Sequence, residues 1–269
     1  MPFKEADRVI YQKNPLVEVV CQLRFPRILS INETSPAAFQ ERIREKYPLF
    51  EVGIEQQQQV TIDTAAEDAA FVPKIVQVEK TKNYKFSSAD SIWRINLTST
   101  FLALSTSTYT TWEEFQSRLK DPFDALVEIY KPAFFERIGL RYIDAFRRAS
   151  LGLSATPWNE LIQPFALGFL SNTDIMNEVK GFSSTGEIDI GNGAIARINT
   201  TLGYVGNIDA QICAGPPELS FIVDSDMFFG KKVIGDTDSS LEFLHGTSTK
   251  LIRALITDKL HEAMGPVKK

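Results

Sequence analysis

Two arginines recur in matching sequence contexts, and their chemistry is that of anion or partner binding. Arg24 and Arg141 each stand between a leucine and an aromatic residue. A guanidinium at such a position binds an anion or a partner surface, or it forms an ion pair with a carboxylate. Glu18 and Glu136 are the carboxylates nearby in the sequence. We predict a binding group made of these four residues, and we favour the structural ion pair over the functional role.

Acidic residues concentrate in one later segment of the chain, around a Gly-Lys-Lys sequence. They are Asp224, Asp226, Asp236 and Asp238. Carboxylates at this density suit Mg²⁺ or Ca²⁺, which prefer oxygen ligands. Their spacing differs from that of an EF-hand, and Asp238 is placed to cap a helix. We assign no metal site to the chain and leave cation binding by this cluster open.

The residues that most often carry catalysis are scarce. His245 and His261 are the only histidines, and on one continuous helix they would lie on roughly opposite faces. Cys21 and Cys213 stand far apart in apolar runs, which predicts two buried free thiols in a reducing compartment. The sequence has no Cys-x-x-Cys pair, no P-loop and no Gly-x-Ser-x-Gly motif. We therefore predict no catalytic residue and no cofactor.

Composition is that of an ordinary globular protein. The 269 residues carry 29 basic and 34 acidic side chains, which disfavours general affinity for nucleic acid or an anionic membrane. If nucleic acid did bind, it would use a local patch of Arg137, Arg141, Arg147 and Arg148. The polar start of the chain does not resemble a signal peptide, and no apolar run is long enough to span a membrane. We expect a cytoplasmic protein without a membrane partner.

The elements that must position these residues recur in two halves. Residues 14–25 and 131–142 each place a proline, then seven residues, then Leu-Arg-aromatic, at an offset of 117 positions. Ser35-Pro36 in the first half and Thr156-Pro157 in the second predict helix starts. Pro164 is expected to shorten or kink the second of these helices.

Alternating apolar and polar residues then predict antiparallel strands in both halves. The predicted strands are 60–62, 74–80, 91–97 and 101–109, then 186–190, 194–202, 207–213 and 218–223. Gly191-Asn192-Gly193 has the chemistry of a hairpin turn. A long helix closes each half: one starts at Thr111 and is bent by Pro122, and the other runs from Asp238 to Gly265.

Together these patterns predict an α+β fold of two tandem β-α-β(4)-α pseudo-repeats, residues 1–130 and 131–269. In each, an antiparallel sheet packs on a long C-terminal helix, and the two repeats form one compact unit. The order is similar to that of the TATA-binding-protein clamp and of helix-grip modules. Such a likeness in topology says nothing about function.

Both ends of the sequence resemble one known family. Residues 14–26 read Asn-Pro-Leu-Val-Glu-Val-Val-Cys-Gln-Leu-Arg-Phe-Pro, and residues 260–266 read Leu-His-Glu-Ala-Met-Gly-Pro. Both resemble a sporadically distributed, uncharacterised bacterial family of similar length. The family carries no activity that can be transferred to this chain. Its sporadic distribution resembles that of genes that move with defence or toxin–antitoxin cassettes.

Three functions follow as hypotheses. The leading one is a non-enzymatic bacterial protein, a component of such a mobile system, that binds another protein through its duplicated surface. A homodimer paired through open sheet edges is one form of this interaction. The second is a small-molecule binder or enzyme with a cavity between sheet and helix. The third is a nucleic-acid clamp, which the charge balance disfavours.

Overall fold

The body of the protein is one antiparallel sheet. The computed structural model describes residues 2–61, 74–205 and 217–268. The sheet contains β2 (Leu16–Arg24), β3 (Leu49–Thr61), β4 (Lys74–Ser87), β5 (Trp93–Leu97), β6 (Phe101–Thr106), β7 (Arg137–Phe146), β8 (Ser183–Gly191), β9 (Ala194–Val205) and β10 (Glu218–Phe229). Their order across the sheet is β3-β4-β5-β6-β2-β7-β10-β9-β8. With the helices below, the fold is α+β.

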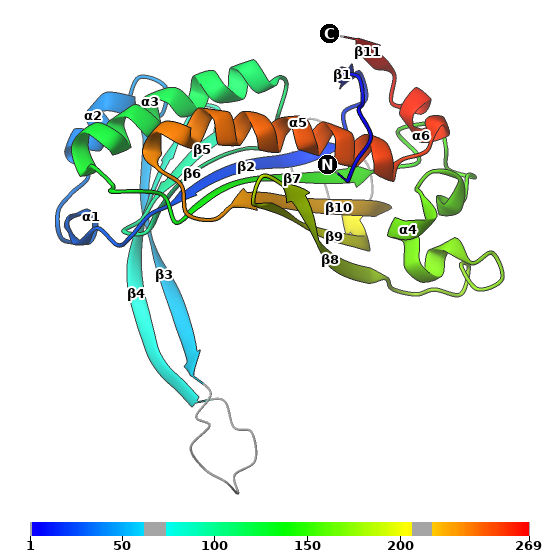
Figure 1. Cartoon of the computed structure of the whole chain (residues 1–269), viewed down its shortest axis with the longest axis horizontal. Helices are drawn as coiled ribbons and strands as arrows, with labels where there is room; N and C mark the ends of the chain where they lie inside the picture. Colours follow the sequence, from blue (N-terminus) through cyan, green and yellow to red (C-terminus); the bar gives the residue numbers. More distant parts are fainter. Residues whose placement is uncertain (1, 62–73, 206–216, 269) are drawn as a thin grey trace, which may run out of the picture.

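Helices cover one face of this sheet (Figure 1). The helices of the described residues are α1 (Leu29–Glu33), α2 (Ala37–Ile43), α3 (Trp112–Tyr130), α4 (Pro164–Leu167), α5 (Thr237–Leu255) and α6 (Asp258–Ala263), with 3₁₀ turns at Trp158–Glu160, Gly168–Ser171 and Ile234–Asp236. Of these, α2, α3 and α5 lie over this face, whereas α1, α4 and α6 lie near the ends of the sheet. The long helices α3 and α5 lie side by side above the central strands. No helix of the described ranges covers the centre of the opposite face, which we call the open face.

Strands β2 and β7 pair at the centre of the sheet, with Cys21 opposite Leu140. All strands on the β2 side precede residue 107, and all strands on the β7 side follow residue 136. Alternate side chains point toward the helices, so Cys21, Leu140 and Tyr142 are buried in the core. Cys21 is a free thiol, as predicted. Cys213 and the strand predicted at 207–213 lie outside the described residues.

Helix α3 begins as its sequence predicts. The Thr111 side chain accepts a hydrogen bond from the backbone N–H of Glu114 at 3.2 Å, which satisfies a donor that the first turn leaves unpaired. Phe115 and Leu126 are on the buried stripe of the helix. Pro122 lies inside α3 without ending it. The hairpin predicted at Gly191-Asn192-Gly193 is also confirmed, because all three residues have positive φ and join β8 to β9.

The prediction of one helix from Asp238 to Gly265 was wrong. Helix α5 ends at Leu255, and Ile256 has extended backbone that pairs with Ile162. The N–H of Thr257 donates to Leu161 at 2.9 Å, and the Thr257 hydroxyl caps α6. This tertiary pairing breaks the helix although the apolar stripe continues through the break. Asp236, without a side-chain cap, takes the N-cap position that Asp238 was expected to fill.

The two predicted helix starts at prolines also differ from the structure. In the first half, α2 begins at Ala37, and Pro36 rather than Ser35 stands at its N-cap position. In the second half, Thr156-Pro157 leads only to the 3₁₀ turn Trp158–Glu160. Pro164 opens the separate short helix α4 instead of kinking a longer one. A proline at the first turn lacks only an N–H that would have had no helical partner.

Two features extend from the body (Figure 1). The hairpin of β3 and β4 projects away from the helices at one end. At the other end, β1 (Val9–Tyr11) pairs with β11 (Pro266–Lys268) in a separate two-stranded sheet. We call residues 7–16, which run from β1 to the start of β2, the strap. Across the described residues, no helix is both long enough and apolar enough to cross a membrane.

Candidate functional site

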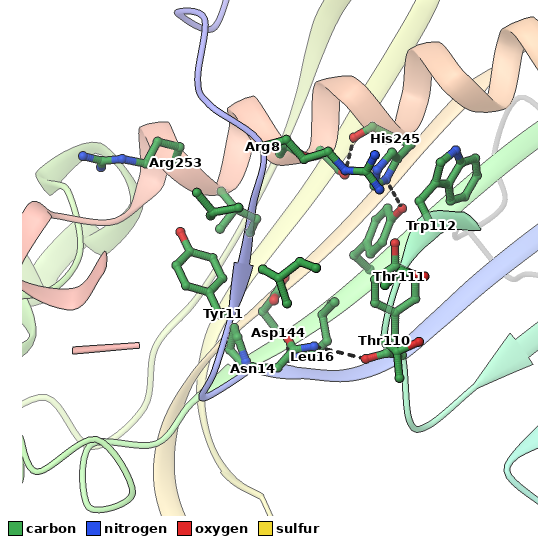
Figure 2. A pocket seen from close by; sticks show the side chains of 18 of the residues that line it. Arg8, Tyr11, Asn14, Leu16, Thr110, Thr111, Trp112, Asp144, His245 and Arg253 are labelled. Atoms are coloured by element: carbon green, nitrogen blue, oxygen red, sulfur yellow. Dashed lines mark hydrogen bonds between the residues drawn. The ribbon is translucent and has the colours of Figure 1, made fainter. Parts of the chain in front are cut away.

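A pocket of about 120 Å³ lies beneath the strap, between helix α5 and the central strands (Figure 2). We call it the strap pocket. Aromatic side chains form part of its walls, and Asp144 is among the other residues that line it. The aromatic residues are Tyr11, Tyr109, Trp112, Tyr142 and His245. They come from the strap, the segment before α3, the first residue of α3, the strand β7 and the helix α5, so the pocket forms only where these five parts of the chain meet.

Asp144 is the most unusual residue of the strap pocket. It sits in β7 between Leu16 of β2 and Val223 of β10, and its side chain is on the helix-covered face. Only 2% of the residue is exposed, and its buried Oδ2 has no hydrogen-bond partner within the described ranges. Burial disfavours the charged form and raises the pKa of Asp144 to about 7. The carboxyl group therefore gains or loses its charge near neutral pH.

Tyr142, His245 and Trp112 form a fixed wall. The Tyr142 hydroxyl lies 2.9 Å from His245 Nδ1. The His245 ring stacks on Trp112 with 4.5 Å between centroids, and Trp112 Nε1 donates to Glu242 Oε1 at 2.8 Å. Burial raises the pKa of Tyr142 well above its usual value, so this phenol stays protonated at neutral pH. Each ring is held by a second group, which gives the wall a defined shape.

Two further tyrosines complete the aromatic lining. Tyr109 packs edge-on against Tyr142, with ring centroids 6.1 Å apart, and burial raises its pKa. The Tyr11 hydroxyl lies 2.8 Å from His261 Nδ1, and burial raises the pKa of Tyr11 to about 12. Tyr11 thereby ties the strap to α6. Both phenols remain neutral in the physiological range.

Backbone contacts next to Tyr11 also fasten the strap. Gln12 N–H donates to Gly265 and Lys13 N–H to Met264, both at 3.0 Å. Gly265 has a φ of +68°, and a Cβ there would lie 3.0 Å from the Gln12 side chain. Only a glycine makes this approach without strain. The roof of the strap pocket therefore depends on the segment that follows α6.

Cationic side chains at the rim already have carboxylate partners. Arg8 donates to both oxygens of Glu113, at 2.9 and 3.0 Å. Arg253 pairs with Asp258, and Figure 2 shows its side chain directed away from Asp144. Neither guanidinium donates to the buried Oδ2 of Asp144. The pocket thus offers an acidic group that the rim arginines do not neutralise.

The predicted binding residues lie elsewhere, on the open face of the sheet. Arg141 donates to both oxygens of Asp224, at 2.6 and 2.7 Å, rather than to Glu18 or Glu136. Asp224 stands on the neighbouring strand β10, and such cross-strand neighbours are invisible to sequence proximity. Arg24 is exposed and stands opposite Arg137 in the β2–β7 register. Glu136 contacts Arg24 through its backbone N–H, which donates to the Arg24 carbonyl at 2.7 Å.

The predicted arginine patch is divided by its own partners. Arg137 Nη2 donates to Asp226 at 2.5 Å. Arg148 lies over the ring of Trp158 and donates to the Thr156 carbonyl at 2.9 Å. With Arg141 paired to Asp224 as well, three of the four arginines are engaged in structural contacts. Two of the four, Arg137 and Arg141, thus have carboxylate partners that offset their charge.

The aspartate cluster separates in the same way. Asp224 and Asp226 pair with arginines on the open face, whereas Asp236 and Asp238 are at the start of α5. Among the residues the structure describes, no group of three or more His, Cys, Asp and Glu side chains is placed to hold a metal ion. His245 and His261, predicted on one helix, lie on α5 and α6, and each contacts a tyrosine hydroxyl.

Sequence reasoning did not single out Asp144. The available signal was an acidic residue inside the apolar strand Ile143-Asp144-Ala145-Phe146, where a charged side chain is rarely buried without a partner. Comparison with known proteins adds no further assignment, because no protein-family model and no curated protein matches the chain.

Proposed function

We propose that this protein binds a small molecule in the strap pocket. The observation that carries the proposal is Asp144, whose buried Oδ2 lacks a partner inside a pocket with aromatic walls. Burying a polar group without a partner costs about 1–3 kcal/mol. Such groups concentrate at binding and catalytic sites, where a ligand supplies the missing interaction.

The geometry around Asp144 favours a bound ligand over a packed core. Tyr142, His245 and Trp112 fix one another, so the wall is shaped before a ligand arrives. Preorganised walls reduce the entropy lost on binding. The strap lies over the pocket and is held by contacts to α6 and to the segment after it. The strap therefore closes one side of the pocket.

The proposal is tested with a variant that fills the pocket. Ser248 lines the strap pocket from α5 and is nearly buried, so Ser248→Phe places a ring inside it. Ser239→Phe makes the same change on an exposed position of α5. Each protein is incubated with a small-molecule cell extract, washed, denatured, and the released compounds are identified by mass spectrometry.

A compound retained by the wild type and by Ser239→Phe, and lost from Ser248→Phe, supports the proposal. Retention of the same compounds by all three proteins would place binding elsewhere and overturn it. Absence of any retained compound from the wild type would also count against it. Circular dichroism of each variant verifies that the sheet and helices are intact.

A second candidate is binding of another protein, favoured by an apolar row on β3. Phe50, Val52 and Ile54 alternate along this edge strand and are 42%, 53% and 67% exposed. Exposed apolar side chains on an unpaired strand edge mark interaction sites. The partner proposed first is a second copy of the chain, with a different protein as the alternative. A bacterial role in a defence or toxin–antitoxin system has its support only in the two end motifs.

This second candidate is tested by charge substitution on one face of β3. Val52→Lys with Ile54→Lys places two cations in the apolar row, while Glu51→Lys adds a cation on the other face of the strand. Sedimentation velocity over a range of concentrations should show wild-type and Glu51→Lys dimers, and monomers for the double variant. Monomeric wild-type protein at every concentration would exclude the homodimer.

We also propose that the two halves of the chain, 1–130 and 131–269, are copies of one unit. The proposal is supported by the strand order: β6-β5-β4-β3 extends from β2, and β10-β9-β8 extends from β7. Each set is followed by a long helix, α3 or α5, on the same face. This order resembles that of the TATA-binding-protein clamp, and it would place a pseudo-twofold axis between β2 and β7. An experimental structure in which 14–25 and 131–142 fail to superpose as equivalent strands would contradict it.

A further inference from the structure

We propose that the ligand of the strap pocket is a small organic ammonium ion, whose head group pairs with the carboxylate of Asp144. This inference rests on the proposed function and names the chemical class of its ligand. Its basis is the combination of the buried Asp144 Oδ2, which has no hydrogen-bond partner among the described residues, and the aromatic side chains that line the same space.

Charge around the pocket favours a cation at Asp144. The rim arginines Arg8 and Arg253 are already paired with Glu113 and Asp258. The phenols of Tyr11, Tyr109 and Tyr142 stay neutral, because burial raises the pKa of each. An ammonium ion would therefore supply the charge partner that the protein itself does not supply. An anion at this place would meet the carboxylate without a compensating cation.

The aromatic walls suit the same ligand. A cation over the face of a tyrosine or tryptophan ring is attracted by the ring quadrupole, by about 0.5–2 kcal/mol. Tyr109 and Tyr142 present rings that meet edge-to-face, and Trp112 stacks on His245 beside them. The tyrosine hydroxyl oxygens also accept hydrogen bonds, so N–H donors of a primary ammonium have acceptors besides Asp144.

The volume limits the size of the ligand. The strap pocket measures about 120 Å³, and a protein cavity of about 150 Å³ holds a benzene molecule. A ligand of about five non-hydrogen atoms therefore fits within the pocket. A longer substituent would have to leave through the mouth beneath the strap. The n-butylammonium ion has the right size and charge to serve as a probe.

The test compares three probes of similar size and different charge: n-butylammonium, 1-butanol and butyrate. Binding of each is measured by NMR titration, because ligands of this size bind weakly. We expect n-butylammonium to bind the wild type at pH 8 at least tenfold more tightly than the other two. Asp144→Asn keeps the shape of the side chain and should lose this preference. Ser248→Phe should lose binding, and Ser239→Phe should retain it.

The pH dependence of binding provides an independent test of the inference. Burial raises the pKa of Asp144 to about 7. Below that pH, the Asp144 carboxyl group of the free protein must lose its proton before it can pair with a cation. Affinity for n-butylammonium, which stays protonated in this range, should fall about tenfold from pH 8 to pH 6. Asp144→Asn should show no such dependence. The other titratable groups that line the pocket are Asp7, Arg8, Arg253, His245 and the three tyrosines.

The outcomes separate the two proposals. If 1-butanol or butyrate binds better than n-butylammonium, and Ser248→Phe abolishes that binding, the pocket is a small-molecule site and the ammonium inference is wrong. If n-butylammonium binds Asp144→Asn or Ser248→Phe as well as the wild type, the inference is also wrong. If no probe binds and the extract yields no compound, the proposed function fails with it.

Discussion

Arg137 occupies the space that a side chain at Gly139 would need. A Cβ built on Gly139 would lie 2.1 Å from Arg137 Nη1. The guanidinium is held there by Asp226 at 2.5 Å, by Gln22 at 3.3 Å and by the ring of Phe228 at 4.5 Å. A side chain at position 139 would therefore displace the Arg137 guanidinium from these contacts on the open face.

Gly139→Ala should destabilise the fold by about 1–3 kcal/mol, because the arginine must leave its site or the strand must shift. In the background Arg137→Ala the same change should cost less than about 1 kcal/mol, since the obstructing atoms are gone. Urea unfolding of the four proteins measures both values. Equal costs in the two backgrounds would show that the Arg137 contact does not explain the need for glycine at position 139.

Asp144→Asn should stabilise the protein, and by more at pH 8 than at pH 5. The pKa of Asp144 is raised to about 7 in the folded state and is about 3.9 in an unfolded chain. Between these values the folded state binds the extra proton, so wild-type stability falls as pH rises toward 7. A tenfold difference in proton affinity between the two states corresponds to about 1.4 kcal/mol. Since the two pKa values differ by about three units, the free energy of unfolding of the variant should exceed that of the wild type by roughly 2–4 kcal/mol at pH 8. Urea unfolding at both pH values measures it.

Asp90→Asn provides a control of opposite sign. Ser88 Oγ donates to Asp90 at 2.5 Å and the N–H of Ile92 donates at 3.1 Å, and these hydrogen bonds lower the pKa of Asp90. Its stabilising effect is present above the unfolded pKa and is lost as pH falls. Asp90→Asn should therefore reduce stability at pH 8. An Asp144→Asn advantage that does not grow between pH 5 and pH 8 would contradict the burial argument.

Cys21 should be unreactive in the native protein. It is fully buried, and burial raises the pKa of its thiol to about 12, which suppresses the thiolate that reacts. In a Cys213→Ser variant, a thiol reagent such as DTNB should label no cysteine without denaturant and one cysteine in concentrated urea. Rapid native labelling would show that the sheet opens readily at β2.

Tyr11→Phe should loosen the strap while leaving the sheet unchanged. The change removes the 2.8 Å contact between the Tyr11 hydroxyl and His261, at a cost of about 0.5–1.5 kcal/mol. Hydrogen exchange should speed up in the strap and stay constant in β7. Tyr47→Phe is the matched control, because it removes a 2.9 Å hydrogen bond to Arg118 far from the strap. Faster strap exchange in both variants would indicate a general loss of stability.

Local signals in the sequence predicted local structure well. The Thr111 cap, the long helix after it and the Gly191-Asn192-Gly193 turn depend on neighbours within a few residues, and all are confirmed. The break between α5 and α6 was missed because its cause is the distant Ile162, which pairs with Ile256. The spacing of apolar residues along a helix carries no information about a distant strand that pairs with its end.

The same limit applies to the candidate site. Arg141 was recognised as a residue with a partner, but that partner, Asp224, is 83 positions away. Asp144 could be placed in an apolar strand from the sequence. Its burial beneath the strap could not, because the cover is formed by Tyr11 and α5, which the chain brings together only in the finished fold.

The pairing of β1 with β11 has a consequence for the order of folding. Lys268 and Asp7 meet although they are 261 positions apart in the chain, and contacts between such distant segments form late, after loop-closure entropy has been reduced by the structure between them. An intermediate with a complete nine-stranded sheet would therefore have a core and no binding site. Ligand affinity would then appear only with the last step of chain closure, so the kinetics of that step could be followed by ligand binding itself.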